Sequence, residues 1–204
     1  MRLLSMDRSD FISTAVRGIH AKPMPEGVGL KIIAVDGHGG AGKTTFAKRL
    51  ASELGGAPIV QTDDFASWEN PLDWWPDLIE KALKPLAAGT PARFTPSNWG
   101  GPEKAPLVIQ PTEFVILEGV SASREAFRPY LTYSIWIDAS RDVRLSRGLG
   151  RDHQVRISHG LQPNPKEALA NWERWMADED GYVAREKPQE HVDQTIPGDK
   201  SLWG

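Results

Sequence analysis

The sequence predicts an α/β fold with three layers, in which helices cover both faces of a mainly parallel five-stranded sheet. Two observations support this prediction. Five short apolar runs recur along the chain, and stretches with helical periodicity separate them. A glycine-rich segment also stands directly between the first apolar run and the helical pattern that follows it. Continuous apolar strands that alternate with helices are typical of a parallel sheet buried on both faces.

The first predicted element is a helix at residues 7–20, because Phe11, Ala15 and Ile19 fall on one helical face. The following "KPMPEGVG" ends this pattern with two prolines and two glycines. We therefore expect residues 1–29 to form a helix and a linker packed on the core, and residues 30–204 to form the main domain. The strands of that domain are predicted at residues 30–35, 57–62, 113–118, 133–138 and 192–196.

Further helices are expected where start and stop signals flank a helical period. One helix begins inside the glycine-rich segment and ends at Gly55 and Gly56, which supply the usual C-terminal stop. A later helix is predicted to begin with Asn164 as its N-cap and Pro165 in its first position. Residues 88–112 contain five prolines and no clear period, so this segment is expected to be a functional or a disordered loop.

Composition excludes several classes of protein. The chain has 204 residues, a length that suits one domain or one domain with a small appendage. It contains no cysteine, which excludes thiol nucleophiles, zinc sites with cysteine ligands and disulfide frameworks. Its formal net charge of -3 gives no general attraction to nucleic acid. No apolar run is long enough for a membrane span or a signal peptide, so we expect a cytoplasmic protein without nucleic-acid or membrane partners.

The chain is rich in tryptophan, with eight in total. Trp172 and Trp175 follow the period of the helix after Asn164 and are expected to lie in the core. Four others either pack in the core and on the surface or form an aromatic wall for a flat substrate. These four stand in loop-like sequence between the predicted strands and are Trp68, Trp74, Trp75 and Trp99.

The glycine-rich segment has the spacing of a phosphate-binding loop. Lys43 is expected to bind the β- and γ-phosphates of ATP, and the hydroxyl group of Thr44 is a suitable Mg²⁺ ligand. Glycines let backbone N–H groups point at a phosphate, and the N-terminus of the following helix favours the same anion. A P-loop NTPase fold that binds ATP with Mg²⁺ is therefore predicted. The segment matches G-x-x-x-x-G-K-[ST] and reads Gly37-His38-Gly39-Gly40-Ala41-Gly42-Lys43-Thr44, followed by Thr45.

The ends of the other strands distinguish between classes of P-loop protein. A GTPase would need an N-K-x-D motif, and the sequence contains none. Two acidic residues compete as the second group directed at Mg²⁺, Glu118 and Asp138. We favour Glu118, because the following Gly119 allows the chain to turn tightly beside the phosphate loop. Asp138 leads straight into a predicted helix and suits a helix cap.

A pair of aspartates, Asp63 and Asp64, ends the second predicted strand in "QTDDF". Ligands of parallel α/β sheets gather at the carboxyl ends of the strands, so a carboxylate here can face the γ-phosphate across the site. We interpret Asp63 as a base for an acceptor hydroxyl group, with Asp64 as the other candidate. In the alternative interpretation the two aspartates are a helix N-cap and a solvated neighbour.

Arginines cluster in the stretch that follows the fourth predicted strand. Such a cluster is either a solvated basic helix face or a lid that neutralises a transferring phosphoryl group. We favour a lid at about residues 144–160, because the rest of the chain has no excess of positive charge. The members of the cluster are Arg141, Arg144, Arg147, Arg151 and Arg156.

These motifs resemble the uridine kinase and phosphoribulokinase branch of the P-loop kinases, which also includes nicotinamide riboside kinase and bacterial pantothenate kinase. The resemblance is carried by "GHGGAGKTT", "QTDDF", "VILEG", "RLSRGLGRD" and "HVDQTIPGD" and covers about residues 30 to 198. It implies that Asp63 is the catalytic base and that Glu118 assists Mg²⁺. It also implies that Arg147 and Arg151 are lid arginines.

The sequence departs from this family where the acceptor would bind. The family has an aromatic residue after its aspartate and a tyrosine–aspartate pair in the long loop, whereas this chain has "ASWENPLDWW" and "TPSNWGG". Trp99 is the expected acceptor contact, with Arg93 as a partner for an anion or a hydroxyl group. The resemblance therefore implies the phosphoryl-transfer machinery and leaves the acceptor open.

We predict a kinase that uses ATP and Mg²⁺ to phosphorylate a hydroxyl group of a nucleoside-like or other small metabolite. The alternatives are a nucleotide-binding switch without a small-molecule acceptor and a binding module that has lost turnover. A base aimed at a second ligand, the role predicted for Asp63, distinguishes a kinase from a switch. The expected partners are ATP and the acceptor, and the chain could form a homodimer.

Overall fold

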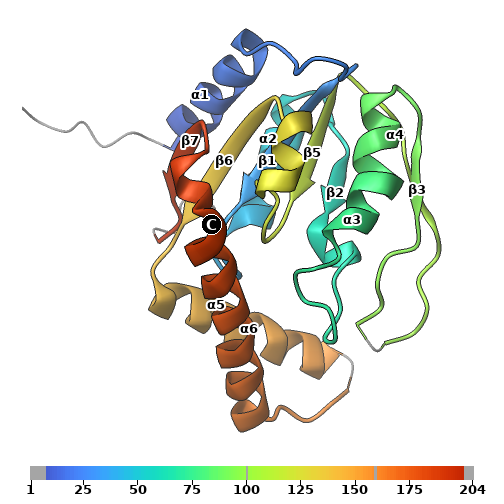
Figure 1. Ribbon diagram of the computed structural model, residues 1–204. Helices are drawn as coiled ribbons and strands as arrows, with labels where there is room; N and C mark the ends of the chain where they lie inside the picture. The colour runs from blue at the N-terminus through green and yellow to red at the C-terminus, as the bar shows by residue number, and fades with distance from the viewer. Residues whose placement is uncertain (1–7, 100, 159, 200–204) are drawn as a thin grey trace, which may run out of the picture.

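The computed structural model describes residues 8–99, 101–158 and 160–199 (Figure 1). The expected start of the first helix at residue 7 lies outside these residues. Within them, five strands form one parallel sheet in the order β2–β5–β1–β6–β7, which confirms the predicted fold class. The strands are β1 Lys31–Asp36, β2 Ile59–Gln61, β5 Phe114–Glu118, β6 Tyr133–Asp138 and β7 Gln194–Pro197.

The helices flank this sheet, and α5 and α6 project together beyond its carboxyl edge (Figure 1). No helix in the described ranges is long and apolar enough to cross a membrane. The helices are α1 Arg8–Ala21, α2 Lys43–Glu53, α3 Trp75–Leu78, α4 Lys84–Ala87, α5 Arg141–Ser158 and α6 Pro165–Glu186. A π-helical segment at Ile79–Leu83 joins α3 to α4, and short 3₁₀ turns lie at Thr62–Asp64, Glu125–Tyr130 and Pro188–Glu190.

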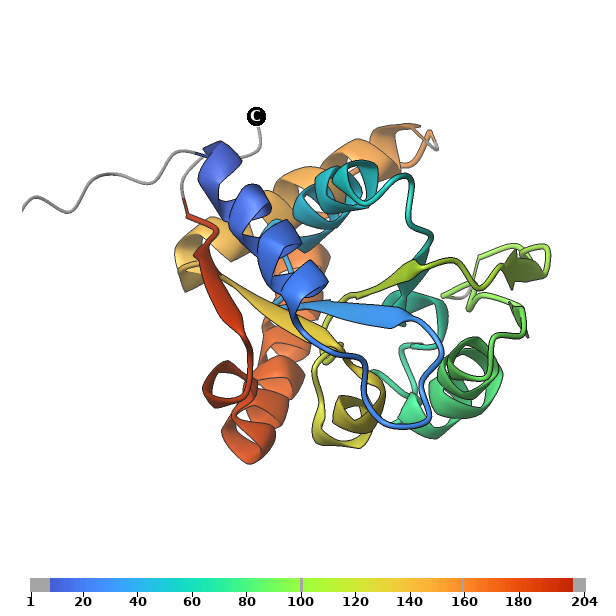
Figure 2. The ribbon, with the colours of Figure 1, turned by 90° about the horizontal axis from the view of Figure 1, so that it is seen from above.

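Alternating residues of the strands enter two separate cores, one on each face of the sheet. Helices α1 and α2 cover one face and α3 and α4 cover the other (Figure 2). Helix α1 is part of the first core through its buried Ala15 and Ile19, whereas the division of the chain at residue 29 stays a prediction. On β1, Ile33 and Val35 face α1 and α2, whereas Ile32 and Ala34 face α3 and α4.

The segment between β2 and β5 contains structure that the sequence analysis missed. Residues 88–112 were expected to be a loop, but they include an antiparallel pair, β3 Ala92–Phe94 and β4 Leu107–Ile109. Trp74 and Trp75 do not form an aromatic wall in a loop. Trp74 is buried in the second core, and Trp75 is the first residue of α3. Ala92 and Phe94 enter the same core, which holds the short ribbon against α3 and α4.

The start of α6 follows its prediction closely. Asn164 accepts a hydrogen bond from the N–H of Glu167 at 3.3 Å, and its amide donates back to the Glu167 carboxylate at 3.0 Å. Pro165 occupies the first helical position. This reciprocal cap fixes where α6 begins and therefore which of its side chains face the sheet.

A buried carboxylate ties β1 to three other segments. Oδ1 of Asp36 accepts hydrogen bonds from the N–H groups of Gly37 at 2.6 Å and Ser121 at 2.9 Å. Oδ2 accepts from the N–H of Ser123 at 2.9 Å, from its hydroxyl group at 2.6 Å and from the hydroxyl group of Tyr182 at 2.8 Å. Burial, with the nearby carboxylate, raises the pKa of Tyr182, so its hydroxyl group stays a donor. Each neighbour donates a hydrogen bond to Asp36. The position therefore suits a carboxylate, whose oxygens accept, and does not suit an amide, which also carries donors.

We predict that Asp36→Asn lowers the free energy of unfolding by about 2–4 kcal/mol, because the amide would turn N–H groups toward groups that also donate. Urea unfolding followed by circular dichroism measures the change. Asp77→Asn is the matched control, since Asp77 is exposed and pairs only with Lys81 one helical turn away among the contacts described. The control should change stability little. Equal effects in the two variants would contradict the role of Asp36.

Candidate active site

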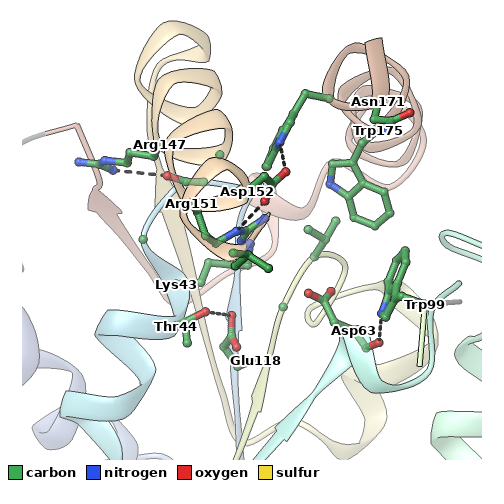
Figure 3. A pocket seen from close by; sticks show the side chains of 18 of the residues that line it. Lys43, Thr44, Asp63, Trp99, Glu118, Arg147, Arg151, Asp152, Asn171 and Trp175 are labelled. Atoms are coloured by element: carbon green, nitrogen blue, oxygen red, sulfur yellow. Dashed lines mark hydrogen bonds and ion pairs between the residues drawn. The ribbon is translucent and has the colours of Figure 1, made fainter. Parts of the chain in front are cut away.

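A cavity of about 850 Å³ opens at the carboxyl ends of the central strands, beneath α5 and α6 (Figure 3). Its walls come from the phosphate loop after β1, the turns after β2 and β5, the loop that carries Trp99, and both projecting helices. Ligands of open α/β sheets bind at this edge. The cavity therefore brings together segments that lie far apart in the sequence.

The phosphate loop needs glycine at the positions where the chain turns back on itself. Gly40 has a φ of 75°, and a Cβ there would lie 2.3 Å from the carbonyl oxygen of Arg144 on α5. Among the predicted nucleotide-binding residues, Gly37, His38 and Ala41 lie outside the cavity wall in the described structure. Those that line the cavity are Gly39, Gly40, Gly42, Lys43, Thr44 and Thr45.

The loop and the start of α2 provide an anion site. Gly42 is the N-cap of α2 and has no side chain to occupy the N–H groups of the first turn. Lys43 is 7 % exposed, and its ammonium group donates to the carbonyl oxygen of His38 at 2.9 Å, across the loop. Backbone donors, a helix N-terminus and an ammonium group thus meet in one place, which fits a polyphosphate.

Glu118 lies beside Thr44 at the edge of the anion site. The hydroxyl group of Thr44 donates to Oε1 of Glu118 at 3.1 Å, and Gln61 donates to Oε2 at 3.3 Å. No cluster of three carboxylate or imidazole groups that could hold a metal ion occurs in the described residues. The oxygens of Thr44 and Glu118 fit Mg²⁺ that is also held by phosphates and water, because Mg²⁺ binds through few protein ligands.

The turn after Glu118 requires glycine, as the sequence suggested. Gly119 has a φ of 141°, and a Cβ there would lie 1.8 Å from Oγ1 of Thr62. Glu118 is 4 % exposed, and burial raises its pKa, an effect that the positive charge of Lys43 opposes. The carboxyl group is thus held next to the phosphate loop in a place where its ionised form is costly.

The two aspartates after β2 face different surroundings. Asp63 lines the cavity, across from Lys43, Thr44 and Glu118 (Figure 3). Asp64 lies outside the cavity wall, 3.9 Å from the ammonium group of Lys104. Burial raises the pKa of Asp64, and Lys104 opposes that shift. Of the pair, Asp63 is the carboxylate that a ligand in the cavity could reach.

Three tryptophans line the cavity, and one of them, Trp99, contacts Asp63. The indole N–H of Trp99 donates to the main-chain carbonyl oxygen of Asp63 at 3.0 Å. The ring of Trp99 meets that of Trp68 edge-on with 5.4 Å between centroids, and that of Trp175 with 5.9 Å. Trp175 comes from α6 and was expected to be core, but it is partly exposed and forms part of the wall.

Arg93, which was expected to contact an acceptor, is not among the residues that line this cavity in the described structure. It is the middle residue of β3, where Ala92 and Phe94 point into the core. Because side chains alternate along a strand, Arg93 points to solvent instead.

The arginines of α5 divide into buried and exposed ones, so the helix is not simply a solvated basic face. Arg144 is 6 % exposed and lies 3.5 Å from the carboxylate of Glu179. Arg147 donates to the carbonyl oxygens of Gly198 at 2.7 Å and Ala41 at 3.4 Å. Its guanidinium group therefore contacts the main chain of the phosphate loop and the end of β7, at the edge of the cavity (Figure 3). Arg151 lines the cavity and projects over Lys43 (Figure 3).

Glu179 on α6 is a site residue that the sequence analysis missed. It is 1 % exposed, and its Oε1 accepts hydrogen bonds from the N–H of Gly39 at 2.6 Å and the indole N–H of Trp175 at 2.5 Å. Burial raises the pKa of Glu179, against the positive charge of Lys43. Burial, and then the charge of Arg144, lower the pKa of His38 to about 4. The available signal was an acidic residue in phase with the apolar face of the helix.

We predict that Glu118→Gln stabilises the nucleotide-free protein at neutral pH by about 1 kcal/mol, the size of a typical stabilising substitution. A raised pKa means that folding favours the protonated carboxyl group, so the ionised group lowers stability once the pH exceeds the ordinary carboxyl range. The gain should shrink as the pH falls toward that range. Urea unfolding at pH 7.5 and pH 4.5 tests both statements. A less stable variant at pH 7.5 would show that the charge of Glu118 is compensated.

Comparisons with known proteins point to one group of kinases. No family model matches the chain. A uridine kinase of Lactiplantibacillus plantarum is 25% identical over 144 residues, which are 61% of this chain and 69% of that enzyme. The chloroplastic phosphoribulokinase of Spinacia oleracea is 26% identical over 198 residues, 81% of this chain and 48% of that enzyme. This chain thus spans about half of the phosphoribulokinase.

A solved structure shares the whole fold. The protein described as a "possible uridine kinase" of Bacillus stearothermophilus superimposes with a TM-score of 0.64, at 17% identity, over 94% of this chain and 100% of that one. At that identity the likeness concerns the fold. The chain is a distant homologue of uridine kinases and phosphoribulokinase, and it has the three-layer α/β fold of P-loop kinases.

Proposed function

We propose that the protein is a kinase that transfers the γ-phosphoryl group of ATP, with Mg²⁺, to a hydroxyl group of a small metabolite. One observation carries the proposal. A phosphate-binding loop and a reachable carboxylate, Asp63, face each other across one cavity. A nucleotide switch needs the loop but no carboxylate aimed at a second ligand. The distant relatives are themselves kinases that act on small molecules, which supports the same assignment.

Each cavity residue has a role in this proposal. Lys43 and the N–H groups of the loop bind the β- and γ-phosphates. Thr44 and Glu118 hold Mg²⁺, which when bound offsets the negative charge of the phosphates. The oxygen of the acceptor hydroxyl group bonds to the γ-phosphorus as ADP leaves, and Asp63 accepts the proton of that hydroxyl group. Arg151 adds positive charge from the lid side.

The acceptor end of the cavity suits a molecule with a flat, partly apolar part. Trp68, Trp99 and Trp175 line the cavity in edge-on contact with one another through Trp99, which bonds to Asp63, and aromatic walls of this kind bind flat rings. Asn171 on α6 contributes an amide to the same cavity. A nucleoside-like molecule, with a flat base and sugar hydroxyl groups, matches both features.

The function is tested by measuring ADP release with Mg²⁺-ATP and a panel of nucleosides, vitamins and sugars. We expect one chemical class to raise the rate well above the rate without acceptor. Lys43→Ala is the control, because the lysine serves the phosphates, so the variant should stay folded by circular dichroism and lose turnover. An active Lys43→Ala protein would exclude phosphoryl transfer from ATP bound at this loop.

The role of Asp63 is tested by a pair of matched variants. Asp63→Asn keeps the shape and removes the proton acceptor, so kcat should fall by about 10²–10⁴-fold with little change in ATP binding. Asp64→Asn, at the neighbouring position outside the cavity wall, should retain most of the activity. If raising Mg²⁺ restored the rate of Asp63→Asn, Asp63 would be a metal ligand instead. If neither variant lost activity, the nucleotide-switch alternative would take precedence.

A further inference from the structure

We infer that Asp152 and Trp172 are positioning residues that direct Arg151 at the terminal phosphate of the bound nucleotide. This inference rests on the proposed function, because it concerns the phosphate end of the same cavity. It assigns roles to Asp152, the last residue of the "RLSRGLGRD" stretch, and to Trp172, which the sequence analysis expected only to lie in the core. The supporting observations are a chain of hydrogen bonds, a buried ring and the different surroundings of two lid arginines.

Arg147 and Arg151 lie one helical turn apart on α5 but make different contacts. The guanidinium group of Arg147 donates hydrogen bonds to main-chain carbonyl oxygens, chiefly that of Gly198 at 2.7 Å. This contact fastens α5 to the sheet. The side chain of Arg151 is 63 % exposed and lines the cavity above Lys43 (Figure 3). A long exposed side chain needs a second group to hold it in one direction, because ordering it costs conformational entropy.

Asp152 provides that group. Its Oδ1 accepts a hydrogen bond from Nε of Arg151 at 3.2 Å, and its Oδ2 accepts one from the indole N–H of Trp172 at 2.6 Å (Figure 3). The contact with Arg151 engages Nε alone. The two terminal nitrogens, which carry the other four N–H donors of an arginine, extend beyond it. The carboxylate therefore sets the direction of the side chain and leaves its phosphate-binding end to the cavity.

Trp172 fixes the carboxylate in turn. The ring is 5 % exposed and packs so closely on α5 that a Cβ at Gly148 would lie 2.2 Å from it. It also packs on the phosphate loop, where a Cβ at Gly39 would lie 3.1 Å from the ring. The guanidinium group of Arg151 lies 5.6 Å from the ring centroid. One rigid side chain thus touches the lid helix, the phosphate loop and the arginine.

The experiment compares the dissociation constants of Mg²⁺-ATP and Mg²⁺-ADP, measured by titration calorimetry on the whole chain. Asp152→Asn keeps the size of the side chain, and Trp172→Phe keeps a ring on Gly148 while it removes the indole N–H. Each should reduce the preference for ATP over ADP by about tenfold, the effect of losing one charge-assisted hydrogen bond. Arg151→Ala should do the same. In the Arg151→Ala background, neither second substitution should reduce the preference further.

Glu173→Gln is the control, because this exposed carboxylate adjoins Trp172 on α6 and should leave the preference unchanged. Additive losses in the Arg151→Ala background would overturn the inference, since residues that only stabilise the fold act independently of Arg151. A stronger preference for ATP in Asp152→Asn would also overturn it, because Asp152 would then hold Arg151 away from the phosphates. So would equal affinities for ATP and ADP in the unsubstituted protein. If that protein bound neither nucleotide, the proposed function would fail instead.

Discussion

The buried carboxylate of Asp36 is the interaction on which the rest of the site depends. Asp36 accepts hydrogen bonds from the N–H of Gly37, at the start of the phosphate loop, and from the N–H groups of Ser121 and Ser123. The two serines lie in the turn after Glu118, the last residue of the neighbouring strand β5. Asp36 also accepts a hydrogen bond from the hydroxyl group of Tyr182 on α6. The relative positions of Lys43, Glu118 and α6 therefore depend on one side chain. Because every partner is a donor, the arrangement requires a group with two accepting oxygens at this position.

Helix α6 connects the sheet and the phosphate loop to α5. Glu179 bonds to the phosphate loop and to Trp175 of the aromatic wall, and Trp172 packs on Gly148 of α5. Moving Arg144 and Glu179 out of water costs free energy, which their attraction at 3.5 Å offsets in part. A helix that only stabilised the fold would be better served by apolar residues at these positions. Their burial next to the phosphate loop is consistent with a site where stability is given up for function.

The sequence was sufficient for the features whose partners lie nearby in the chain. The phosphate loop, the turn at Gly119 and the cap at Asn164 each depend on a few consecutive residues. The five strands of the sheet could be predicted because each is a short apolar run. The contacts of Asp36 with Tyr182 and of Glu179 with Gly39 join residues 146 and 140 positions apart, so no local pattern reveals them. The exposed position of Arg93 on β3 was hidden for a different reason. Its strand has three residues, too few to show the alternation that turns it to solvent. The roles of the site residues stay predictions.

The central place of β1 in the sheet also bears on how the chain folds. As the first strand of the described chain, β1 lies between β5 and β6, so that Ile33 pairs with Ile116 on one side and Tyr133 on the other. During synthesis the apolar residues of β1 emerge long before β5 and β6, the strands with which they pair. Parallel pairings over such sequence separations are slow to form, since the intervening chain has to be ordered first. The phosphate loop after β1 is thus synthesised early, and it acquires its folded shape only after β5 and β6 have been added to the sheet.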